Sequence, residues 1–177
     1  GTNNGVNDGT VGGIQFIDFA NLTGGSLDDT FRFTPGASVT GAVNGGTAGL
    51  DFIDYSLYTG IIGVNAVSIN IVDNNTVATT VAASATNIDG VIGNNTASTL
   101  TGLAAGSNWD INGSNDGVVT SGTASLTFVD FNNLTGGTGV DRFTINTNGS
   151  ITGVINGVGV GNSLTARNGV NYWTIAA

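Results

Sequence analysis

One stretch of this sequence occurs twice, and the duplication limits the fold more than any other feature. Residues 16–33 (FIDFANLTGGSLDDTFRF) return as residues 128–145 (FVDFNNLTGGTGVDRFTI), 112 positions further on. Over residues 16–45 and 128–157, half of the aligned pairs are identical. Internal duplication of this kind is typical of solenoids, propellers and arrays, in which each repeat stacks on its neighbours.

A second match has a different offset, so the second copy is shorter. Four residues recur 64 positions later: Leu100, Thr101, Trp109 and Ile111 return as Leu164, Thr165, Trp173 and Ile175. The second copy therefore lacks 112 − 64 = 48 residues, which correspond to about residues 50–97 of the first. A stack of repeats tolerates the loss of whole coils. We predict one domain over 1–177, with a longer subrepeat (about 16–127) and a shortened one (about 128–177, continuing into 1–15 of a following copy).

The two ends of the sequence match each other. Ile111 precedes Phe128 by 17 residues, and Ile175 would precede Phe16 of a following copy by 18. We expect copies to continue end to end, either within one long chain or as stacked subunits.

The composition favours an all-β fold. The chain has 30 Gly and one Pro, and it has no Cys, Met, His, Lys or Glu. Helix surfaces are built mainly from Ala, Leu, Glu, Lys, Gln, Arg and Met, whereas Gly, Asn, Asp, Ser and Thr between short Val, Ile and Phe runs indicate strands and turns. A hydrophobic fraction of 40% argues against disorder.

The charge excludes two classes of partner. A net charge of −9, with only three Arg as bases, is incompatible with the clustered cations that bind nucleic acid. It also disfavours an anionic membrane surface, and no apolar run reaches the roughly 18 residues of a membrane span. We expect neither nucleic-acid binding nor membrane insertion.

Short strands between turn clusters predict a parallel β-solenoid (β-helix) open to end-to-end stacking. Coils of roughly 20 residues would give about eight to nine levels at about 4.8 Å each. A β-sandwich also has short strands, but it would not explain a clean 48-residue deletion or matching ends. Residues predicted to maintain the repeat, as aromatic core ladders or corners, are Phe16, Asp18, Phe19, Asn21, Leu22, Gly24, Gly25, Phe31, Trp109, Phe128, Asp130, Phe131, Asn133, Leu134, Gly136, Gly137, Phe143 and Trp173.

The turns carry a family resemblance. Residues 136–143 (GGTGVDRF) fit the calcium-binding nonapeptide G-G-x-G-x-D-x-U of RTX proteins, and residues 24–31 (GGSLDDTF) fit with Leu27 in place of the third Gly. The wider frame FxDFxNLTGGxxxDxF, followed by TGxxNG and DYS, resembles the tandem repeats of giant bacterial surface and secreted adhesins of the haemagglutinin-like type. The resemblance implies a right-handed parallel β-solenoid, an extracellular or cell-surface location, and a scaffolding or adhesive role that could include cell-surface or matrix glycans.

Two alternatives concern the Asp residues. Ca²⁺ near Asp28, Asp29 or Asp141 would make this an RTX-like calcium module, although the motif is not repeated in tandem as shared ions require. The competing interpretation is that Gly-Gly serves tight corners and Asp caps backbone amides. Enzymatic function is disfavoured, because without His, Cys, Lys or Glu only Asp, Tyr and Arg remain for proton transfer or nucleophile activation. A polysaccharide-active solenoid would use Asp28 and Asp29 or Asp51 and Asp54.

The predicted edges carry the functional hypothesis. Natural solenoids cap or charge their terminal coils, because unpaired strand edges join other chains. The sequence offers no Lys, Pro or amphipathic helix near either end, and it finishes with NYWTIAA. We therefore expect a non-enzymatic module without cofactors, whose main partners are copies of itself, in a fibre or an adhesin stalk.

Overall fold

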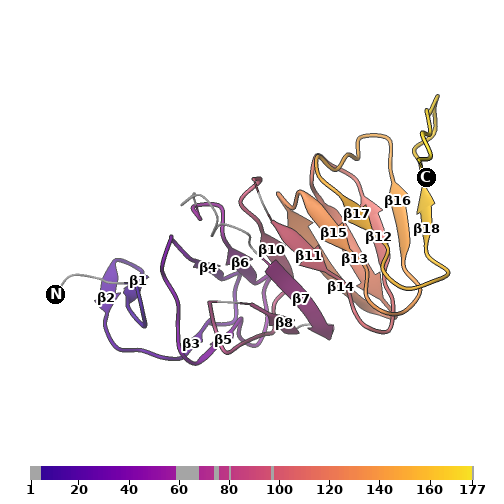
Figure 1. The fold of residues 1–177 in the computed structure, drawn as a ribbon. Helices are drawn as coiled ribbons and strands as arrows, with labels where there is room; N and C mark the ends of the chain where they lie inside the picture. Colours follow the sequence, from indigo (N-terminus) through magenta and orange to yellow (C-terminus); the bar gives the residue numbers. More distant parts are fainter. Residues whose placement is uncertain (1–4, 59–67, 74–75, 80, 97, 177) are drawn as a thin grey trace.

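The computed structural model describes residues 5–58, 68–73, 76–79, 81–96 and 98–176. The described residues form strands and turns and contain no helix, so no helix there could cross a membrane. The all-β prediction is therefore confirmed. Two eight-stranded sheets make up most of the molecule, and a separate hairpin precedes them (Figure 1).

We name the sheets by their first strands. The β3 sheet runs in the order β3-β5-β9-β8-β7-β11-β15-β17. Its strands are β3 (Leu22–Thr23), β5 (Ala42–Asn44), β7 (Ser68–Asp73), β8 (Thr76–Ala78), β9 (Ser84–Thr86), β11 (Thr99–Thr101), β15 (Asn133–Thr135) and β17 (Ile155–Asn156).

The β4 sheet runs in the order β4-β6-β10-β14-β13-β12-β16-β18. Its strands are β4 (Thr30–Arg32), β6 (Phe52–Asp54), β10 (Gly90–Ile92), β12 (Asn108–Ile111), β13 (Gly117–Ser121), β14 (Ala124–Val129), β16 (Arg142–Ile145) and β18 (Ser163–Thr165). The separate hairpin joins β1 (Gly9–Val11) to β2 (Ile14–Phe16) in antiparallel register.

The chain alternates between the two sheets, and most neighbouring strands are parallel. β3, β4, β5 and β6 fall in turn in the β3 sheet and the β4 sheet, and β15, β16, β17 and β18 repeat this order. Strands of two to six residues suit such a path, because parallel neighbours require a crossover rather than a tight turn.

Two segments depart from uniform parallel pairing, which corrects the sequence prediction. In the β3 sheet, β7-β8-β9 is an antiparallel meander, and in the β4 sheet β12-β13-β14 is another. In both cases the first strand of the meander does not pair with the preceding strand of its sheet. The third strand does so instead, in parallel register: β9 pairs with β5, and β14 pairs with β10. Each sheet contains one such insert, so the two sheets keep the same number of strands.

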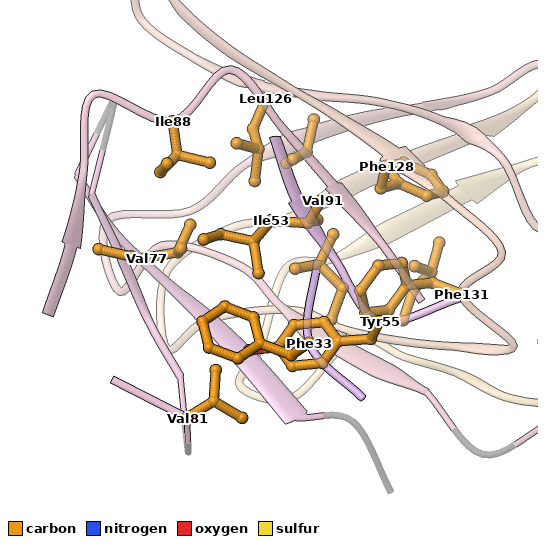
Figure 2. Close-up of a cluster of buried hydrophobic side chains, with 14 of the residues drawn as sticks. Phe33, Ile53, Tyr55, Val77, Val81, Ile88, Val91, Leu126, Phe128 and Phe131 are labelled. Carbon is orange, nitrogen blue, oxygen red and sulfur yellow. The ribbon is translucent and has the colours of Figure 1, made fainter. Parts of the chain in front are cut away.

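The core lies between the sheets. Val43, Leu100 and Leu134 come from the β3 sheet, and Ile53 and Phe128 come from the β4 sheet, all with no exposed surface. Figure 2 shows Phe128 and Phe131 in one cluster with Val91, Ile53 and Tyr55. Alternate residues of a strand point to the same face, so each short strand can bury one face in the core without a long apolar run.

The aromatic ladder prediction holds for the second copy and fails in part for the first. Phe128, Phe131 and Phe143 are buried, as is Trp109. Phe16 and Phe31 are only half-buried. The remaining two are exposed: Phe19 by 57% and Trp173 by 61%. The physical reason is position, because these residues lie near the ends of the molecule, where no further strand of the described residues covers them (Figure 1).

The shortened copy also resumes at a different strand than the sequence match predicts. The offset of 64 equates Leu164 with Leu100 of β11, which belongs to the β3 sheet. In the structure β18 pairs with β16 in the β4 sheet, with Leu164 opposite Phe143, as Ile53 of β6 lies opposite Phe31. Ser163–Thr165 thus takes the place of β6, because alternation between the sheets requires a β4-sheet strand after β17.

Candidate functional site

The candidate site comprises the two open ends of the sheets. At one end β3 and β4 are the last strands, and at the other β17 and β18 are. A terminal strand leaves its outer row of N–H and C=O groups without a sheet partner, which makes it a template for another strand. Among described residues no helix covers either end. Both ends therefore present a strand edge without a sheet partner among the described residues.

Exposed apolar side chains gather at both ends of the chain. Near the N-terminus they belong to the hairpin and the residues after it, and near the C-terminus to the loop before β18 and the segment after it. In these segments the side chains with more than half of their surface exposed are Val11 (67%), Ile14 (70%), Phe19 (57%), Leu27 (78%), Val160 (87%), Val170 (81%), Tyr172 (94%), Trp173 (61%) and Ile175 (93%), and two others, Leu50 (59%) and Val154 (62%), lie outside them. Clusters of this kind mark interaction surfaces.

A ladder of side-chain hydrogen bonds crosses successive levels just before the β4-sheet strands. The backbone amide of Asp29 donates to Asp51 Oδ1 (2.9 Å), and that of Asp51 donates to Asp89 Oδ2 (2.9 Å). In the second copy, Ser107 N donates to Asp141 Oδ1 and Asp141 N to Asn162 Oδ1, both at 2.8 Å. Each acceptor caps the amide of its neighbour, so the ladder fixes the height of one level above the next.

Sequence reasoning missed Asp89, Ser107 and Asn162 as members of this ladder. The signal was an Asp, Asn or Ser directly before each short apolar run, at spacings too irregular to stand out as a motif. The ladder also explains the buried acids Asp51, at 2% exposure, and Asp141, at 0%. Their amide-capping role agrees with the structural interpretation of these acids.

The corner residues act in the same way in both copies. Asn21 Oδ1 accepts the amide of Ala42 (2.8 Å), and Asn133 Oδ1 accepts that of Val154 (3.0 Å). The predicted Asn corners therefore bond to the backbone of the next level. Gly24 and Gly136 lie where a Cβ would collide with the carbonyl oxygens of Gly45 and Gly157, so close approach of the levels requires glycine.

The recurring Asp residues occupy turns with left-handed backbone. Asp18 and Asp130 have φ of 65° and 59°, and each amide donates to an earlier carboxylate, Asp8 Oδ1 and Asp116 Oδ1 respectively. Burial and the nearby Asp116 carboxylate raise the pKa of Asp130 above its ordinary value. The two Asn-Asp-Gly steps also have a left-handed backbone, with φ of 59° at Asn7 and 63° at Asn115.

The three acids considered for calcium are divided between the two copies, with Asp28 and Asp29 in the first and Asp141 in the second. Asp28 Oδ1 accepts the amide of Leu50 (2.9 Å), and Asp29 Oδ2 accepts that of Gly25 (2.6 Å). Asp141 has one oxygen engaged by Ser107, whereas its buried Oδ2 has no hydrogen-bond partner within the described part of the chain. No group of three or more His, Cys, Asp or Glu side chains that could hold a metal ion occurs among those residues.

Asp54 belongs to an ion pair. Its Oδ2 accepts from Arg32 Nε (2.6 Å), and its Oδ1 accepts from the amide of Ser56 (2.7 Å). Burial acts to raise the pKa of Asp54, but the hydrogen bonds from Ser56 and Arg32 outweigh it and hold the pKa below its ordinary value. The structure therefore gives the two acids different roles. Asp51 belongs to the amide ladder, and Asp54 forms an ion pair between the paired strands β4 and β6.

No family profile, curated protein or solved structure matches this chain. Its function is accordingly inferred from its own geometry.

Proposed function

We propose that this chain is a structural repeat module of an extracellular bacterial fibre or adhesin stalk, without enzymatic activity, which continues head to tail through strand stacking. In this proposal the two sheets are successive faces of a right-handed parallel β-solenoid whose ends join copies of the same unit. Cell-surface or matrix glycans are further candidate partners.

The observation that carries the proposal is the openness of both ends. β3 and β4 have one sheet neighbour each, and so do β17 and β18 at the opposite end. Parallel stacking of the next unit would extend both ladders without changing the direction of any strand, since the outermost pairs at both ends are already parallel. The Asp residues that give the net charge of −9 are spread along the chain, and none lies in β17 or β18.

Negative-stain electron microscopy and sedimentation velocity of the purified chain test this proposal. We expect filaments, or a series of multiples of the single unit, whose length grows with protein concentration. Leu164→Lys, which places a charge on the terminal strand β18, is expected to shorten them at least tenfold. Ala78→Lys, on an exposed position of β8 in the middle of the β3 sheet, is the matched control and leaves them unchanged. A single 17.6-kDa species at every concentration would refute the proposal.

One observation supports a second candidate, a calcium-binding module. Asp141 is the Asp of the GGTGVD turn that resembles the RTX nonapeptide, and its buried Oδ2 lacks a hydrogen-bond partner within the described residues. Calcium prefers such carboxylate oxygens, although it needs six to eight ligands in total. Thermal unfolding followed by circular dichroism with and without Ca²⁺ separates the candidates: an unchanged melting temperature removes the calcium module and leaves the structural one.

A further inference from the structure

The N-terminal hairpin is the counterpart of two strands of the second insert. β1 and β2 pair with Gly9 opposite Phe16, as β13 and β14 pair with Gly117 opposite Phe128. The residues that lead into the two hairpins also match, with NDG at 7–9 and again at 115–117. In the second copy, however, the hairpin has a third strand, β12, and no strand of the described residues takes that position in the first copy.

β12 joins the hairpin to β16. It pairs antiparallel with β13, where Trp109 is opposite Val119, and parallel with β16, where Trp109 is opposite Phe143. The indole of Trp109 stacks on Phe143, with ring centroids 5.3 Å apart and an interplanar angle of 14°. It also meets Phe128 edge-on at 5.9 Å. Trp109 is therefore the centre of the junction and is 1% exposed.

The chain carries a second version of β12 at its C-terminal end. Residues 172–175 (YWTI) match residues 108–111 (NWDI) at the offset of 64, so that Trp173 corresponds to Trp109 and Ile175 to Ile111. Residues 172–175 belong to no strand. Trp173 is 61% exposed and Ile175 is 93% exposed, whereas Trp109 and Ile111 are buried. This segment has the sequence of a core strand without the surroundings of one.

The first copy presents the complementary defect. Val11, the counterpart of Val119, is 67% exposed, whereas Val119 is 2% exposed. Phe16 and Phe31 are half-buried, although their counterparts Phe128 and Phe143 are fully covered by Trp109 and its neighbours. The side chains that would face an inserted tryptophan are present and uncovered.

We propose that residues 172–175 of a second copy of this chain insert between β1 and β4 as the missing third strand. The segment would run antiparallel to β1 and parallel to β4, with Trp173 opposite both Val11 and Phe31, and with its ring against Phe16. Strand addition to an open edge provides the main-chain hydrogen bonds, and the tryptophan provides specificity. The inference rests on the end-to-end assembly proposed above and specifies the junction.

A disulfide test exploits the absence of cysteine. Asp110 and Val118 are cross-strand partners that face outward, and their counterparts are Thr174 and Thr10. The double variant Thr10→Cys with Thr174→Cys is expected to form, on oxidation, a ladder of covalent multiples on a non-reducing gel. The matched control, Gln15→Cys with Thr174→Cys, places the first cysteine on β2, one strand further from the inserted segment. It is expected to give at least tenfold less cross-linking.

Complementation provides the second test. Val11→Asp damages the acceptor and Trp173→Asp damages the donor, and both residues are exposed in the single unit, so each variant is expected to melt at the wild-type temperature. Each variant alone should remain a single unit, and an equimolar mixture should give dimers that grow no further. Assembly of Trp173→Asp at the wild-type concentration, or equal cross-linking of the Gln15 control, would overturn this junction while leaving the proposed array intact. Absence of any assembly in the unmodified chain would refute both.

Discussion

The two copies of the repeat share half of their aligned residues over thirty positions but bury them to different depths. Phe131 and Leu134 have no exposed surface, whereas their counterparts Phe19 and Leu22 are exposed and half-buried. In the sheets, β15 of the second copy lies between β11 and β17 and β16 lies between β12 and β18, whereas β3 and β4 of the first copy have one sheet neighbour each. In a stacked fold, then, the same residue becomes core or surface according to its neighbours, which makes the ends of this unit incomplete in a predictable way.

The largest contrast is expected at the two tryptophans. Trp109→Ala should lower the free energy of unfolding by about 3–5 kcal/mol, because it removes a buried indole that packs on Phe128 and Phe143. Trp173→Ala should change it by less than about 0.5 kcal/mol in the single unit, because that side chain is exposed. Urea unfolding at concentrations below assembly measures both, and similar losses would contradict the difference in burial.

A smaller contrast is expected at the two turn asparagines. Asn115 Oδ1 accepts the amide of Thr152 (2.8 Å) and its Nδ2 donates to Asn95 Oδ1 (2.8 Å), in a side chain that is 2% exposed. Asn7 Oδ1 accepts the amide of Thr40 (2.8 Å) in a more open position. Asn115→Ala should cost about 2–3 kcal/mol and Asn7→Ala about 1 kcal/mol in urea unfolding, since the buried partner groups of Asn115 lose their bonds without access to water. A larger loss at Asn7 would be inconsistent with this.

Acid sensitivity is expected to arise in the first copy. Arg32 lies opposite Asp54 there, whereas the equivalent position of the second copy pairs Thr144 with Thr165. Because folding holds the pKa of Asp54 below its ordinary value, the stabilisation is present above about pH 4 and is lost as the pH falls through the lowered pKa.

Between pH 5 and pH 3 the free energy of unfolding should therefore fall by about 1 kcal/mol less in Asp54→Asn than in the wild type. The difference is modest because Arg32 is 56% exposed. Thermal unfolding across this pH range is the measurement. Thr144→Ser, in the copy that lacks the ion pair, is the control and should follow the wild-type curve.

The smallest effect is expected at the left-handed turns. The raised pKa of Asp130 means that its carboxylate is less favourable in the folded state than in the unfolded one, so the penalty is present at pH 7 and disappears as the pH falls below the ordinary pKa. Asp130→Asn keeps a residue that tolerates positive φ and should raise stability by a few tenths of a kcal/mol at pH 7. At pH 3 the two proteins should unfold at the same urea concentration. Asp18→Asn is the matched substitution in the exposed copy.

The sequence predicts the strand content of this protein well and the order of its strands poorly. Short runs such as FRF at 31–33 and the Gly-Gly corners were readable from residue type, because side-chain alternation and turn chemistry are local. The two fold-back inserts could not be predicted in this way. β9 pairs with β8 and also with β5, a strand far earlier in the sequence, so its place in the sheet depends on a long-range contact. The amide ladder was also hidden, because it joins residues up to 38 positions apart that share only a short polar side chain.

The fold-back inserts also bear on how such a chain acquires its structure as the ribosome releases it. β7 emerges before β9, yet β9 is the strand that pairs with β5. Likewise β12 emerges before β14, the strand that pairs with β10. A nascent chain therefore cannot add one strand at a time to the sheets in the order of translation. It must complete each three-stranded meander before the meander can pair with the earlier strand of its sheet. We therefore expect each meander to fold as one cooperative unit, and the pairing of a meander with the earlier strands to be the slowest step.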